Sequence, residues 1–241
     1  MKIFICDGTV KCFYTAVFDA YREKECVITS DDATQLSLDS EIIKVVANNE
    51  KADRVEKGIK KCDSEAPYDI EFALRSGDAL KEQICFGYIK KLLERKSPVK
   101  KAYNLPEVIE FNDILHKVSF EVHRLKGFLR FMESADGVLY APYSPDNDIT
   151  DLLTAHFAER LKSERFVIHD LKRKIAGMYN GHEWITGYAG EAEIYLSEYE
   201  RAFETLWKKY YKAVNIESRP HEKQMKGYMP VRYWKHLPEK K

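Results

Sequence analysis

The chain has 241 residues, of which 44% are hydrophobic, a share sufficient for a substantial buried core. Its 39 lysines and arginines balance 39 aspartates and glutamates, so a globally basic nucleic-acid-binding protein is excluded, although a local basic patch is not. The sequence holds no apolar run of about 18 residues, and we therefore expect a protein that stays off the membrane and in the cytoplasm.

Five cysteines lie in the first third of the chain, and none forms a C-x-x-C pair. They are Cys6, Cys12, Cys26, Cys62 and Cys85. This usage favours reduced thiols in a cytosolic protein. The alternative is one reactive thiol, for which Cys6 and Cys12 are the candidates because they flank the Asp7-Gly8 turn.

The first hundred residues predict one strand followed by helices. Residues 2–6 favour a strand, Asp7-Gly8-Thr9 is typical of a turn, and residues 13–21 have helical spacing. Further helical signals cover residues 40–46, 51–61 and 79–95. We expect a strand-plus-helices region over 1–104 and an α+β domain over 105–241, although the two can form one continuous globular unit.

Residues 104–126 carry the clearest helical pattern of the chain. Pro106 suits the first turn, and Gly127 suits the end. A heptad-like apolar stripe runs through Val108, Phe111, Leu115, Val118, Val122 and Leu125. The pattern predicts a central core helix.

The pattern after residue 127 changes to strands. Residues 128–133 and 137–142 predict a hairpin, and a helix follows to about residue 162. A meander is predicted over residues 165–170, 175–179 and 182–185, with Asn180-Gly181 as a hairpin turn. Ser197 and Glu200 suit a capping box for a helix to Val214. The predicted fold class is α+β, with an antiparallel sheet from the hairpin and the meander packed against several helices.

Six segments of the sequence occur in a characteristic order: ICDGTVKCFYTAVFDAY (5–21), EVHRLKGFLRF (121–131), LYAPYSPDNDI (139–149), HFAERLKSERFVIHD (156–170), SEYERAFETLWKKYY (197–211) and MPVRYWKHLPE (229–239). Together they resemble a bacterial family of DNA-metabolism or DNA-repair proteins. The resemblance covers both ends of the chain and leaves residues 25–100 as its diverged part.

The resemblance implies an association with another enzyme and does not assign a reaction to this chain. The family has no established reaction and is associated with a radical-SAM DNA modification or repair protein. Some relatives carry a domain similar to uracil-DNA glycosylases, which we do not expect in this chain. The sequence also has no C-x-x-x-C-x-x-C motif, so we do not expect it to be the radical-SAM enzyme itself.

The first group of candidate site residues lies on the predicted core helix and just after it. Glu121 and Arg124 are one helical turn apart, and this spacing is typical of a surface ion pair. The functional alternative is a pocket rim, in which Arg124 and Arg130 bind a phosphate or carboxylate and His123 moves a proton.

A second group lies on the helix and strand that follow. His156 and Arg160 share one helix face, which is either a solvated edge or an anion site. His169 and Asp170 lie at the end of a predicted strand. In one interpretation Asp170 stabilises the following turn, Lys172-Arg173-Lys174. In the other it joins a catalytic cluster with His123, His156 and His169. Arg173 in that turn is either solvated or a phosphate contact.

The last residues of the chain mix positive charge with aromatic rings. This mixture is typical of single-stranded nucleic-acid binding, in which cations bind phosphate and rings stack on bases. The alternative is that the rings anchor the segment to the core. The residues singled out are Arg219, Arg232, Tyr233 and Trp234.

No residue spacing indicates a metal site, and no P-loop or G-x-G-x-x-G motif indicates a nucleotide cofactor. The preferred hypothesis is an accessory protein of DNA metabolism or repair that binds nucleic acid or a radical-SAM partner. The alternatives are a protein–protein adaptor without nucleic-acid contact, which docks a partner through the C-terminal tail and the helix of Trp207, Tyr210 and Tyr211, and an enzyme with a His/Arg-lined pocket. No complete catalytic motif is present, which disfavours the enzyme.

Overall fold

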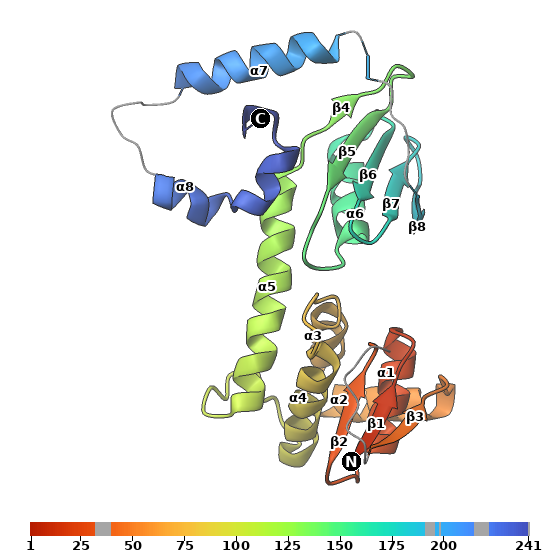
Figure 1. The fold of residues 1–241 in the computed structure, drawn as a ribbon. Coiled ribbons are helices and arrows are strands. Elements are labelled where there is room, and N and C mark those ends of the chain that lie inside the picture. The colour runs from red at the N-terminus through yellow and green to blue at the C-terminus, as the bar shows by residue number, and fades with distance from the viewer. Residues whose placement is uncertain (32–39, 191–195, 198, 215–221, 241) are drawn as a thin grey trace. The chain divides into compact units, whose positions relative to one another are not determined.

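The computed structural model describes the whole chain except residues 32–39, 191–195, 198, 215–221 and 241 (Figure 1). Helices and two sheets confirm the α+β fold class. The chain forms two compact units, Met1–Ser119 and Phe120–Lys241, and the division falls within helix α5 (Pro106–Phe128). The domain boundary predicted after residue 104 lies just before this helix. Whether residues 1–104 and 105–241 are separate domains stays a prediction.

The first unit contains a parallel sheet in the order β2-β1-β3. Its strands are β1 (Lys2–Ile5), β2 (Cys26–Thr29) and β3 (Glu41–Lys44). Helix α1 (Val10–Ala20) connects β1 to β2, as parallel strands require a crossover. Thr9 caps this helix, since its hydroxyl oxygen accepts a hydrogen bond from the backbone N–H of Cys12 at 3.2 Å. The predicted strand, turn and helix at the N-terminus are therefore confirmed.

The helix predicted over residues 40–46 is wrong, because this segment contains strand β3. Ile42 and Ile43 lie opposite Ile3 and Phe4 of β1 in the parallel register. Pairing with a strand that is distant in sequence overrides the weak local preference of this segment for helix.

Among its described residues, the first unit also contains three further helices and the beginning of α5. They are α2 (Asn49–Cys62), α3 (Ala66–Ala73) and α4 (Lys81–Arg95). The largest fully buried side chains of this unit include Phe13, Ile28, Ile59, Ile70, Tyr88 and Phe111. The rings of Tyr88 and Phe111 stack with their centroids 3.8 Å apart, which joins α4 to α5.

The five cysteine thiols are free. Burial raises the pKa of both Cys6 and Cys12 above the ordinary value of a thiol. A thiol held in its protonated form is a poor nucleophile, so neither residue has the environment of a reactive cysteine.

Helix α5 confirms the predicted core helix and extends it to Phe128. Val108, Phe111, Val118, Val122 and Leu125 are buried as the stripe predicts, whereas Leu115 is only half-buried. The extension of the helix leaves no room for a strand that starts at residue 128.

The second unit contains a five-stranded sheet in the order β4-β5-β6-β7-β8. Its strands are β4 (Met132–Glu133), β5 (Leu139–Tyr143), β6 (Phe166–Asp170), β7 (Ile175–Tyr179) and β8 (Trp184–Tyr188). The predicted hairpin and meander are antiparallel within themselves, but β5 and β6 pair in parallel. Helix α6 (Thr150–Arg160) causes this difference, because it carries the chain back so that β6 starts beside the start of β5.

The remainder of the second unit, where the structure describes it, is mainly helical. It comprises α7 (Glu200–Val214), α8 (Glu222–Tyr228), and the short 3₁₀ helices η1 (Val231–His236) and η2 (Pro238–Lys240). The predicted capping box of α7 is replaced by contacts to β4. The Glu133 N–H donates to the Glu200 carboxylate at 2.9 Å, and the Ser197 N–H donates to the Glu133 carbonyl at 2.9 Å.

Candidate functional site

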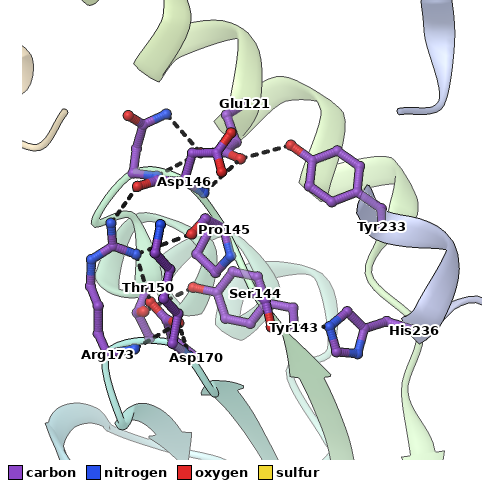
Figure 2. A network of polar contacts seen from close by, with 12 residues as sticks. Glu121, Tyr143, Ser144, Pro145, Asp146, Thr150, Asp170, Arg173, Tyr233 and His236 are labelled. Atoms are coloured by element: carbon purple, nitrogen blue, oxygen red, sulfur yellow. Dashed lines mark hydrogen bonds and ion pairs between the residues drawn. The ribbon is translucent and has the colours of Figure 1, made fainter. Parts of the chain in front are cut away.

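Polar side chains of the second unit gather where the parallel strands β5 and β6 end (Figure 2). The carboxyl ends of neighbouring parallel strands meet at one edge of a sheet, and this edge is a common place for binding sites. Here the loop 144–149 follows β5, and the turn 171–174 follows β6. The 3₁₀ helix η1 contributes Tyr233 and His236 to the same network (Figure 2).

Glu121 of α5 is the centre of this network and is only 2% exposed. Its carboxylate accepts hydrogen bonds from the backbone N–H groups of Asp146 and Asn147 at 3.1 and 2.8 Å. The Asn147 side-chain amide donates at 2.7 Å, and the Tyr233 hydroxyl donates at 2.7 Å. Glu121 thus holds the loop after β5 and the C-terminal segment to one point of α5.

Arg232 lies at the solvent side of the same carboxylate. Its guanidinium group is 3.4 Å from Glu121 and 3.0 Å from the Asp146 carboxylate, and it donates to the Tyr233 hydroxyl at 2.9 Å. Burial raises the pKa of Tyr233, so its hydroxyl stays a hydrogen-bond donor. Arg232 and Tyr233, both predicted as nucleic-acid contacts, hold the C-terminal segment in place.

Asp170 is fully buried at the end of β6. Its carboxylate accepts from the backbone N–H groups of Lys172 and Arg173 at 2.9 and 3.2 Å, and it pairs with the Arg173 guanidinium at 3.0 Å. Arg173 also donates to the carbonyl oxygens of Pro145 and Asp146. Asp170 therefore sets the turn, as one of the two sequence interpretations has it, and Arg173 ties this turn to the β5 loop.

The other arginines predicted to bind anions lie in different places. Arg124 donates to the Gly227 carbonyl at 2.7 Å and lies 4.0 Å from the ring centroid of Phe120. Arg130 donates to the Gly127 carbonyl at 2.8 Å. Arg160 is exposed at the end of α6, and Arg219 lies outside the described residues.

The three histidines predicted as catalytic candidates have different neighbours. The Nδ1 atom of His169 lies 2.9 Å from the Tyr140 hydroxyl, and its Nε2 atom lies 3.3 Å from the Ala189 carbonyl. His156 contacts the edge of Phe157, and His123 is exposed on α5. Asp170 binds Arg173 rather than an imidazole. Among the residues that the structure describes, no three His, Cys, Asp or Glu side chains are grouped as a metal site requires.

The environment of His156 should make the stability of the second unit depend on pH. Burial, followed by the charges of Lys126 and Arg160, lowers the pKa of its imidazole below the ordinary 6.5. As the pH falls below about 6.5, the unfolded chain therefore binds a proton on His156 while the folded chain does not yet bind one. The free energy of unfolding decreases with falling pH until the pH drops below the pKa of His156 in the folded chain. We expect His156→Gln to lose less unfolding free energy than the wild type between about pH 7 and about pH 5.5. Equal losses in urea unfolding at the two pH values would contradict this assignment.

Helix α7 carries aromatic side chains of which Trp207 and Tyr210 were predicted to dock a partner protein in the adaptor alternative, whereas Phe203 was not singled out. Phe203, Trp207 and Tyr210 are 62%, 38% and 58% exposed and lie on one side of the helix. The Trp207 and Tyr210 ring centroids are 5.7 Å apart, and the Arg130 guanidinium lies 5.4 Å from the Trp207 ring. The helical spacing of these rings was visible in the sequence, but it is equally typical of a buried face.

A cavity of about 610 Å³ lies beside these rings within the second unit. Its lining includes Arg130, Phe131, Phe203 and Trp207, with carboxylates at Glu133 and Glu200. In contrast, two rings predicted for stacking in the C-terminal segment, Tyr233 and Trp234, are withdrawn from solvent, while Tyr228 of α8 is 69% exposed. Tyr233 is buried, and the half-buried Trp234 donates its indole N–H to the Met229 carbonyl at 3.0 Å.

None of the helices that the structure describes combines the length and the apolar character needed to cross a membrane. No curated protein and no solved structure matches the chain. A family model described as a domain of unknown function, DUF4130, matches residues 79–239, which includes the network around Glu121 and all of α7. The chain therefore belongs to the DUF4130 family.

Proposed function

We propose that this chain is a nucleic-acid-binding accessory protein of DNA metabolism, and that its second unit binds a single strand through helix α7. The resemblance to bacterial DNA-metabolism and DNA-repair proteins supports a role in DNA metabolism. The exposed rings of α7 support binding of a single strand by base stacking. In this proposal Arg173 and Arg232, at the end of the sheet, stabilise the fold of the second unit. The contacts to the nucleic acid are made by α7.

The stripe of Phe203, Trp207 and Tyr210 is the observation that carries the proposal. Exposed rings in one row can stack on successive bases of a single strand, and each stacked base contributes roughly 1–3 kcal/mol. A duplex offers no such contact, because its bases are already stacked and paired. The row therefore favours a single strand.

Exposed lysines lie on the same helix and in the C-terminal segment. Lys209 and Lys212 are exposed on the same helix, and Lys208 lies 2.9 Å from the Glu204 carboxylate. In the C-terminal segment Lys223 and Lys235 are exposed as well. Lysines of this kind bind phosphates without reading sequence, so the affinity should fall steeply as salt rises.

The test is a fluorescence-anisotropy titration of a labelled single-stranded oligonucleotide. We expect Phe203→Ala/Trp207→Ala/Tyr210→Ala to weaken binding by about tenfold or more, since about 1.4 kcal/mol corresponds to a factor of ten. A matched control removes two exposed rings of the first unit, Tyr68→Ala/Tyr103→Ala, and should bind as the wild type does. Binding that is absent, insensitive to salt, or equal in the triple variant would refute the proposal.

A second candidate, a protein–protein adaptor, is favoured by strand β8. It is the last strand of its sheet among the described residues, and all five of its residues are exposed, including Trp184, Ile185 and Tyr188. An exposed apolar edge strand can pair with a strand of another protein. The resemblance suggests a radical-SAM DNA modification or repair protein as that partner. Co-purification that survives nuclease treatment and is lost in Ile185→Lys would favour this candidate.

A further inference from the structure

The first unit contains a cavity of about 470 Å³ formed by helices α1, α2 and α4. Val17 and Val55 are buried and Leu93 is half-buried, so the inner lining is apolar. Arg22 and Arg54 are exposed and bring two guanidinium groups to the same cavity. The volume lies within the range of roughly 300–1,000 Å³ that small-molecule sites occupy.

The charge of this lining is positive. Asp19 is the acidic residue of the lining, and its carboxylate is already paired with Lys51 at 2.6 Å. The Arg54 guanidinium and the Lys51 ammonium lie 5.6 and 5.7 Å from the ring centroid of Phe18. Within the described part of the chain, neither Arg22 nor Arg54 has a carboxylate within ion-pair distance. Two guanidinium groups are thus available to an anion.

Gly58 is a second, independent sign that this cavity is kept open. It lies in the interior of α2 and lines the cavity, although glycine is the poorest helix former after proline. A Cβ atom at this position would meet only the Leu93 Cδ2 atom, at an ordinary contact distance of 3.7 Å. Sterics therefore do not require glycine here, and its effect is to leave the space next to Leu93 empty.

We propose that this cavity binds an amphipathic anion, a small phosphate or carboxylate attached to an apolar or aromatic body. The anionic group binds between Arg22 and Arg54, because the guanidinium fork matches the oxygen geometry of phosphates and carboxylates. The apolar body packs on Val17, Val55 and Leu93. This site lies in the first unit and does not depend on nucleic-acid binding by α7.

Isothermal titration calorimetry of the full chain with three probes tests both halves of the proposal. Phenyl phosphate carries the anion and the ring, inorganic phosphate carries the anion only, and phenol carries the ring only. We expect phenyl phosphate to bind at least about tenfold more tightly than either fragment. Inorganic phosphate or phenol binding as tightly as phenyl phosphate would overturn the proposal, since one half of the cavity would then contribute nothing.

Variants locate the binding. Arg22→Gln/Arg54→Gln should weaken phenyl phosphate binding at least about tenfold, whereas Lys60→Gln, an exposed charge of α2 outside the cavity, should not. Gly58→Met should fill the cavity and abolish binding while the melting temperature stays equal or rises, because methionine is a good helix former. No binding of phenyl phosphate to the wild type, or unchanged binding in either cavity variant, would refute the site.

Discussion

Replacing Glu121 with alanine should lower the free energy of unfolding of the second unit by about 3–5 kcal/mol. The side chain is 2% exposed and accepts from two backbone N–H groups, the Asn147 amide and the Tyr233 hydroxyl, while Arg232 lies 3.4 Å away. Its loss leaves buried donors without an acceptor, and each such donor costs about 1–3 kcal/mol.

Urea unfolding followed by circular dichroism measures this effect. Glu159→Ala is the matched control, because Glu159 is an exposed glutamate of helix α6 in the same unit. Limited proteolysis adds a local readout, since the C-terminal segment should become cleavable near Tyr233 in the Glu121 variant. A destabilisation below about 1 kcal/mol, with unchanged protection of this segment, would show that Glu121 does not hold the network together.

Replacing Gly177 with alanine should destabilise the second unit by several kcal/mol, on the order of 3 or more. A Cβ atom at this position of β7 would lie 1.8 Å from the Thr154 hydroxyl oxygen and 2.9 Å from the Thr154 Cβ. Thr154 is fully buried on α6, and its hydroxyl donates to the Thr150 carbonyl at 2.7 Å. The helix therefore has to move away from the sheet to admit one methyl group.

A double-mutant cycle identifies the cause of this loss. Thr154→Ala removes the hydroxyl and Cγ2 atoms that meet the new methyl group, so Gly177→Ala should cost less in that background, by at least about 1 kcal/mol. Gly187→Ala in the neighbouring strand β8 is the control, since its Cβ would meet no atom within 4 Å. Additive effects at positions 177 and 154 would mean that the helix and the sheet do not approach as closely as the structure shows.

The parts of the fold that follow from local patterns were predictable from the sequence. The apolar stripe of α5 is such a pattern, and Asn180-Gly181 is another, since Gly181 has φ +98° and the Asn180 N–H donates to the Glu183 carbonyl. The connection covers residues 180–183, however, so β8 starts at Trp184 and not at residue 182 as predicted. Strand β3 was not predictable in this way. Its identity depends on pairing with β1, nearly forty residues earlier in the chain.

The candidate site shows the same limit. The spacing of Glu121 and Arg124 predicted a local ion pair, but Glu121 binds Asn147 and Tyr233, and Arg124 binds the Gly227 carbonyl. These partners lie from 26 to 112 residues away in the sequence. The spacing of apolar and charged residues within one helix cannot predict contacts over such separations. For Asp170 the partner is the following turn, and the sequence did offer that interpretation.

The exposed rings of α7 differ from both cases. A row of apolar residues at helical spacing predicts that one face of the helix is buried, but it does not say by what. In this structure Phe203 and Tyr210 remain largely exposed, so a partner from outside the chain can reach these two rings. That availability is a property of the whole unit, and only coordinates can reveal it.

The fluorescence of Trp207 tests the stacking proposal most directly. In a Trp184→Phe/Trp234→Phe variant, Trp207 is the remaining indole of the three in the chain. Titration with a single-stranded oligonucleotide should quench its emission, because a stacked base contacts the ring, and added salt should restore it as the strand dissociates. Emission that stays unchanged while anisotropy reports binding would place the nucleic acid elsewhere on the protein and contradict the role of α7.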